Sequence, residues 1–131
     1  MSILSFTPSN WGWTAIIPGF GLLADQFPQP ALHVWSLDAS GPAAFGRAAR
    51  VPLKPFLWHH RRRAATTRAH SVVPPRRVGG NLDIRDLAAG CTLYLPVEVE
   101  GALFSVGDTH AAQGDGEACG TAIESPMIAR R

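Results

Sequence analysis

The sequence has no long uninterrupted apolar run, because polar or charged residues break every stretch before the roughly 18 residues that a membrane-spanning helix needs. Residues 1–13 also lack the basic segment and apolar core that a secretory signal requires. With only two cysteines, Cys91 and Cys119, the chain has no disulfide framework. These absences predict a cytoplasmic protein with reduced thiols and no membrane contact.

Acidic residues are missing from the middle of the chain. None occurs between Ala39 and Leu82, where most of the 12 Lys and Arg residues fall, and most of the 10 Asp and Glu residues follow this stretch. Such a basic segment can contact nucleic-acid phosphates, with Trp58 stacking on bases. No nucleic-acid-binding motif accompanies the arginines, however. A small nucleic-acid-binding module therefore stays an alternative, and nucleic acid is not the expected partner.

Glycine and proline are abundant, at 13 and 11 residues, which favours a loop-dense, β-rich chain over a helical bundle. Residues 31–37 (ALHVWSL) alternate as a strand does. Residues 91–99 and 102–106 predict two further strands, joined as a hairpin at Gly101. We therefore expect one mainly β fold, a β-rich α+β arrangement with short helices.

Asp108 and His110 lie two positions apart at the end of the second strand of this hairpin. In extended backbone, side chains at this spacing point to one face, so both can reach one ion. A carboxylate with an imidazole suits zinc, and carboxylate-rich sets suit harder cations such as calcium. The alternative is a surface hydrogen-bonding pair, because short motifs of this kind are common.

Residues 113–117 (QGDGE) bring more polar groups back toward this pair. Gly114, Gly116 and Gly120 allow the backbone to adopt positive φ angles and to pass close to a ligand. Glu117 is the candidate third ligand or general base, and Asp115 is a weaker candidate.

A second polar cluster spans residues 79–86 (GGNLDIRD). In an extended segment, Asn81, Asp83 and Arg85 would share one face, opposite the apolar Leu82 and Ile84. One interpretation is a solvated strand face. The functional interpretation is that Asn81 and Asp83 face the same cavity as Asp108.

Both clusters, together with WGWT and PGFGLLAD near the start, resemble the acetamidase/formamidase family. Residues 11–27, 51–57 and 71–127 carry this resemblance, and the string GDTHAAQGDGE is its most specific part. The resemblance implies hydrolysis of short aliphatic amides, formamide and acetamide, to a carboxylate and ammonia. It further implies a bound divalent metal ion, zinc with calcium as the alternative, and a homo-oligomer.

On this interpretation, Asp83, Asp108 and His110 hold the metal ion, which activates a water molecule for attack on the amide carbonyl. Glu117 is the catalytic residue that carries the proton to the departing nitrogen. Asn81 and Gln113 are the candidate substrate-binding residues.

A cysteine nucleophile is the alternative chemistry for an amidase. Cys119 would then need a glutamate and a lysine beside it. The only lysine, Lys54, lies in a proline-bracketed segment, so we expect Cys119 to be buried and unreactive.

Members of the family are longer, so we expect residues 1–131 to form a partial domain that is truncated at both ends. An inactive fragment of the family is therefore the alternative function. Residues 58–69 (WHHRRRAATTRA) also depart from the Gly, Val, Ala and Pro-rich loop that the family has at this place. GC-rich codons for residues 58–68, read one base later, encode GTIGVAPPRPG, which predicts a frame-shifted segment at 58–69.

Overall fold

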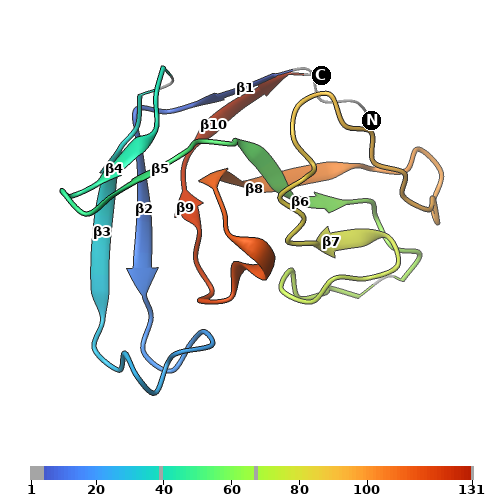
Figure 1. Ribbon diagram of the computed structural model, residues 1–131. Coiled ribbons are helices and arrows are strands. Elements are labelled where there is room, and N and C mark those ends of the chain that lie inside the picture. Colours follow the sequence, from blue (N-terminus) through green and yellow to red (C-terminus); the bar gives the residue numbers. More distant parts are fainter. Residues whose placement is uncertain (1–4, 39, 67, 131) are drawn as a thin grey trace.

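The computed structural model describes residues 5–38, 40–66 and 68–130, and strands dominate it (Figure 1). Its one short helix in this part of the chain is the 3₁₀ turn η1 (Asp115–Glu117). The mainly β fold expected from the sequence is thus confirmed. The strands are β1 (Ser5–Pro8), β2 (Trp11–Ile16), β3 (Ala31–Ser36), β4 (Ala43–Phe45), β5 (Ala49–Val51), β6 (Phe56–Arg61), β7 (Gly79–Asn81), β8 (Ser105–Ala112), β9 (Ile123–Glu124) and β10 (Met127–Arg130).

Six strands form one antiparallel sheet in the order β3-β2-β9-β8-β6-β7. In Figure 1, the antiparallel strands β2 and β3 lie vertically on the left of the molecule, whereas β6, β7 and β8 lie across the right. The change of direction lies at the β8–β9 pairing, where the register shifts between His110 and Ala112. Such irregularities bend a strand and often adjoin functional sites.

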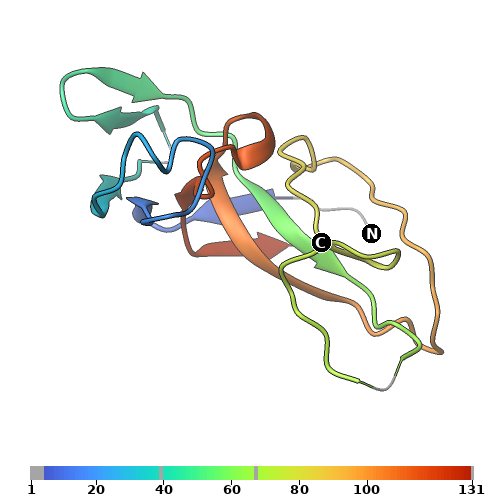
Figure 2. The same cartoon turned by 90° about the horizontal axis from the view of Figure 1, so that it is seen from below.

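Two smaller ribbons complete the fold. The β4–β5 hairpin stands away from the six-stranded sheet, which is clearest in Figure 2. Strands β1 and β10 pair in antiparallel fashion, so both ends of the described chain meet in one ribbon. The main apolar core combines residues in or next to the large sheet with residues in or next to these ribbons, namely Trp35, Leu37, Ala43, Ala111, Ala112 and Ile123, with Val51, Leu53 and Met127 packed against them.

The sequence placed one strand correctly and one hairpin wrongly. Residues 31–37 form β3 up to Ser36. Residues 91–104, however, lie outside the named strands, and the second strand of the expected hairpin is the beginning of β8, which pairs with β6 and β9 instead. The local alternation indicated extended backbone, but the pairing partner came from a distant part of the chain.

The expected extended face of residues 81–85 is also wrong. Strand β7 ends at Asn81, and Asp83 adopts a left-handed backbone with φ of 54°. The chain then turns, so Asn81, Asp83 and Arg85 do not share a strand face. Arg85 forms an ion pair of 2.9 Å with Asp115.

Both cysteines are free, as expected. The expectation of a buried Cys119 is wrong: its side chain is exposed, because it follows η1 in a turn at the surface. No helix in the described part of the chain has the length and apolar character needed to cross a bilayer. Strand β6 extends into residues 58–69 as far as Arg61, and the side chain of His60 within it is buried.

Candidate metal centre

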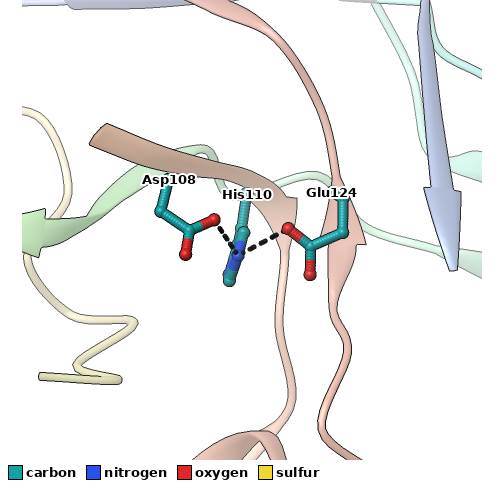
Figure 3. A group of neighbouring side chains, drawn as sticks. All are labelled: Asp108, His110 and Glu124. Carbon is teal, nitrogen blue, oxygen red and sulfur yellow. Dashed lines mark hydrogen bonds and ion pairs between the residues drawn. The ribbon is translucent and has the colours of Figure 1, made fainter. Parts of the chain in front are cut away.

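His110 is the centre of the polar cluster. Its side chain is fully buried, and its Nε2 atom lies 2.9 Å from Oε2 of Glu124 and 3.3 Å from Oδ1 of Asp108. Oε1 of Glu117 follows at 4.0 Å. Figure 3 shows the two nearer carboxylates on either side of the imidazole, Asp108 from the same strand and Glu124 from β9. One nitrogen atom thus faces three acidic side chains.

The strand pairings explain why these groups meet. His110 is the register partner of Glu124 on β9 and of Phe56 on β6. The Phe56 ring, which is also fully buried, packs edge-on against the imidazole at a centroid distance of 5.5 Å. The aromatic contact and the two flanking strands therefore fix the position of the histidine ring.

Glu124 is held at both of its carboxylate oxygens. Oε1 accepts a hydrogen bond of 3.1 Å from the backbone N–H of Ala122, and Oε2 faces His110. Behind Glu124, strand β2 approaches closely at Gly12, where an added Cβ would lie 2.7 Å from the Glu124 carbonyl oxygen. A glycine at this position allows β2 to pack against β9.

The opposite side of the imidazole contacts Gln113. Nδ1 of His110 lies 2.9 Å from Oε1 of Gln113, whose Nε2 atom donates a 3.2 Å hydrogen bond to the carbonyl oxygen of Asp83. Each ring nitrogen of His110 therefore has polar neighbours, carboxylates at Nε2 and a carboxamide at Nδ1.

The acidic groups alter the protonation of His110. Burial alone would lower its pKa, but hydrogen bonds to Asp108 and Glu124 and the charge of Glu124 outweigh burial and raise the pKa to about 10. In the metal-free chain, His110 is therefore a cation that neutralises part of the surrounding negative charge.

The pKa of Glu117 is also raised, but here burial is the main cause. Its side chain is buried, and burial is the largest cause that raises its pKa, to about 7. The nearby His110 lowers the pKa, whereas the charges of Glu124, Asp83 and Asp108 raise it further. A carboxyl group with a pKa near neutrality is suited to general acid–base chemistry.

Three acidic residues of this region have a left-handed backbone. Asp83, Asp108 and Glu117 have φ angles of 54°, 56° and 47°. Non-glycine residues adopt this conformation infrequently, and each instance costs about 1–3 kcal/mol. Such strain is concentrated at functional sites, where the surrounding structure holds it in place.

The donor set matches a divalent cation. Ligand atoms of Asp108, His110 and Glu124 all lie within 4.8 Å of one another. An imidazole with carboxylates is a normal set of ligands for zinc, and additional carboxylates favour harder cations. A cation here would also compensate the negative charge that crowds around Glu117.

The sequence-predicted residues meet only in part. Asp108 and His110 come together as expected, and Glu117 joins them at the edge of the cluster. Asp83 contributes its charge to the surroundings of Glu117 and its carbonyl oxygen to Gln113. Asn81 lies on β7, opposite His59 and two strands from β8, and Asp115 is exposed in its ion pair with Arg85.

The sequence interpretation missed Glu124. It gave no role to this residue, although Glu124 ends the polar segment that begins before Asp108. No local sequence signal marks it, because β9 (Ile123–Glu124) is only two residues long and its antiparallel pairing with β8 joins separate segments of the chain. A carboxylate on that strand can lie directly opposite the histidine.

Comparisons with known proteins agree with this architecture. Residues 49–129 match the model of the Acetamidase/Formamidase family. Over 45 residues, the chain is 56% identical to an acetamidase of Mycolicibacterium smegmatis and 53% identical to a formamidase of Methylophilus methylotrophus, in alignments that cover 34% of this chain and 11% of each relative. A solved acetamidase structure from Bacillus halodurans matches with a TM-score of 0.90 and 31% identity over 98% of this chain and 43% of that one. The chain thus spans less than half the length of that relative.

Proposed function

The chain belongs to the acetamidase/formamidase family, and on this premise we propose that it hydrolyses short aliphatic amides, formamide and acetamide, with the help of a bound divalent metal ion. The observation that carries the proposal is the buried His110 between two carboxylates, beside a third carboxyl group whose pKa lies near neutrality. The names of the relatives, acetamidase and formamidase, support the substrate class.

In this proposal, Asp108, His110 and Glu124 hold the cation, and Asp83 is a further ligand from the neighbouring loop. When bound, the cation supplies Lewis-acid activation of water and of the amide carbonyl. Zinc is the proposed ion because the set contains an imidazole, and calcium is the alternative because all of the other donors are carboxylates.

Glu117 acts as the general base and acid. Because its pKa lies near 7, it accepts a proton from the attacking water and then donates a proton to the departing nitrogen. The C–O bond forms first, by addition of the water oxygen to the carbonyl carbon, and the C–N bond breaks after the nitrogen has been protonated. The products are a carboxylic acid and ammonia, which become carboxylate and ammonium by proton transfer between them. Because the side chain of Glu117 is buried, the proton that it carries is kept away from bulk solvent. Asn81 remains the proposed substrate-binding residue, whereas both polar atoms of the Gln113 carboxamide already contact His110 and Asp83.

Ammonia release from formamide and acetamide, measured with and without added zinc, tests the proposal. We expect zinc-dependent release that Glu117→Gln and His110→Ala reduce at least about 100-fold. The matched control is Asp86→Asn, which removes an exposed carboxylate whose ion-pair partner is Lys54. Zinc binding without any ammonia release would contradict the proposed activity and favour the inactive alternative.

The proposal also includes a cytoplasmic location and a homo-oligomer. Two free cysteines suit a reducing compartment. Leu32 and Val34 on the edge strand β3 are exposed by 67% and 60%, and apolar side chains of this kind favour a protein–protein contact. Light scattering after size-exclusion chromatography tests the oligomer. A monomeric mass at all concentrations would contradict it.

A further inference from the structure

We propose that Gln113 is a positioning residue, which holds the His110 ring so that Nε2 faces the carboxylates and the cation. The inference rests on the metal site of the proposed function. In this inference, the Gln113 carboxamide serves to hold the His110 imidazole and does not primarily contact the substrate.

The orientation of the Gln113 carboxamide follows from its second contact. The backbone carbonyl oxygen of Asp83 only accepts hydrogen bonds, so the group 3.2 Å from it must be the amide nitrogen. The amide oxygen is then the atom that lies 2.9 Å from Nδ1 of His110. An oxygen acceptor at this position requires a proton on Nδ1.

A proton on Nδ1 makes Nε2 the nitrogen that can bind a cation. Nε2 is also the ring atom that lies nearest to Asp108 and Glu124. Metal-binding histidines usually donate their other N–H to an oxygen acceptor, which fixes both the tautomer and the ring orientation. Gln113 supplies this acceptor three residues after His110 along the chain.

The same carboxamide connects two separate parts of the site. Gln113 follows β8, whereas Asp83 belongs to the loop after β7 and has a left-handed backbone. The hydrogen bond from Gln113 to the Asp83 carbonyl therefore holds this loop beside the His110 ring. Loss of Gln113 would release both the ring nitrogen and the loop.

Two substitutions separate the contributions of the carboxamide. Gln113→Leu removes both hydrogen bonds at similar volume. Gln113→Glu keeps an oxygen acceptor for Nδ1–H but loses the donor to Asp83. Gln26→Leu, at an exposed glutamine outside the site, is the matched control.

The first readout is zinc affinity, measured by competition with a chelator. Gln113→Leu is expected to weaken binding about 10–100-fold, the usual effect of removing the partner of a metal-bound histidine. Gln113→Glu is expected to recover most of that loss, and Gln26→Leu to bind as the parent chain does. Circular dichroism of each variant establishes that it is folded.

The second readout is the Nδ1–H signal of His110 in ¹⁵N-labelled protein, which needs neither metal nor activity. It should be protected from exchange in the parent chain and in Gln113→Glu, and unprotected in Gln113→Leu. Unchanged protection and unchanged zinc affinity in Gln113→Leu would overturn the positioning role. A Gln113→Leu variant in which only the KM for the amide substrate rises would also overturn it. A parent chain that shows the protected signal but binds no zinc would instead refute the proposed function.

Discussion

Glu124 places its Oε2 atom 2.9 Å from Nε2 of His110, and the two residues are register partners on neighbouring strands. His110 lies on β8 and is a candidate site residue from the sequence alone. Glu124 lies on β9 and was identified only from the structure. The backbone of Glu124 is in turn packed against β2 at Gly12. The geometry of the site therefore depends on how closely three strands approach.

Gly12→Ala is expected to disturb the site without removing any of its polar groups. The added Cβ would lie 2.7 Å from the Glu124 carbonyl oxygen and 2.9 Å from Cγ2 of Ile123, so β9 must shift. We expect a loss of about 1–3 kcal/mol in the free energy of unfolding, together with weaker zinc binding. Urea denaturation and chelator competition measure the two effects. Gly41→Ala, where an added Cβ meets nothing within 4 Å, is the control, and equal stability of the two variants would contradict the packing argument.

Phe56→Ala is expected to destabilise the chain by about 3–5 kcal/mol, because it empties a fully buried site behind the His110 ring. The free energy of unfolding from urea denaturation measures this loss. Phe27→Ala removes a ring that is 51% exposed and should have a small effect. Similar losses in the free energy of unfolding for both variants would contradict the assignment of Phe56 as a core residue.

The metal-free chain should lose stability as the pH rises. The pKa of Glu117 is raised, mainly by burial, from 4.5 to about 7. The pKa of His110 is raised from 6.5 to about 10, because contacts with Asp108 and Glu124 outweigh its burial. In both cases the folded chain binds protons more tightly than the unfolded chain does. Their contribution to stability is therefore complete below the unfolded pKa and is lost as the pH rises through the folded pKa.

Urea denaturation with a chelator present, from about pH 4 to about pH 10, measures this trend. The comparison with Glu117→Gln isolates one group, because other titrations are shared by both proteins. The stability of the parent chain relative to this variant should fall between about pH 4.5 and pH 7. A relative stability that rises over this window would contradict the assigned surroundings of Glu117.

The frame-shift hypothesis for residues 58–69 stays a prediction that the nucleotide sequence tests. We expect the neighbouring frame at this place to encode a peptide that resembles GTIGVAPPRPG. Any other peptide in that frame would rule the hypothesis out. Strand β6 ends at Arg61, so most of this segment lies in the connection toward β7.

The sequence predicted the β-rich fold because Gly, Pro and the short alternating segments are local signals. It also predicted that Asp108 and His110 meet, and their ligand atoms do lie close together, although the left-handed backbone of Asp108 departs from the extended geometry assumed in that prediction. Strand partners are not local: β8 pairs with β6 and β9, which left the expected hairpin wrong and Glu124 unnoticed. The left-handed backbone of Asp83 likewise depends on tertiary contacts that no alternation pattern encodes.

Zinc titration of the parent chain against three single variants tests the metal site most directly. Asp108→Asn, His110→Ala and Glu124→Gln each remove one of the grouped ligand atoms. Glu100→Gln, at an exposed turn, is the control. We expect one bound zinc ion in the parent chain and in the control, with zinc affinity reduced more than about tenfold in each of the three variants. Equal affinity in Glu124→Gln and in the parent chain would contradict the assignment of Glu124 as a ligand.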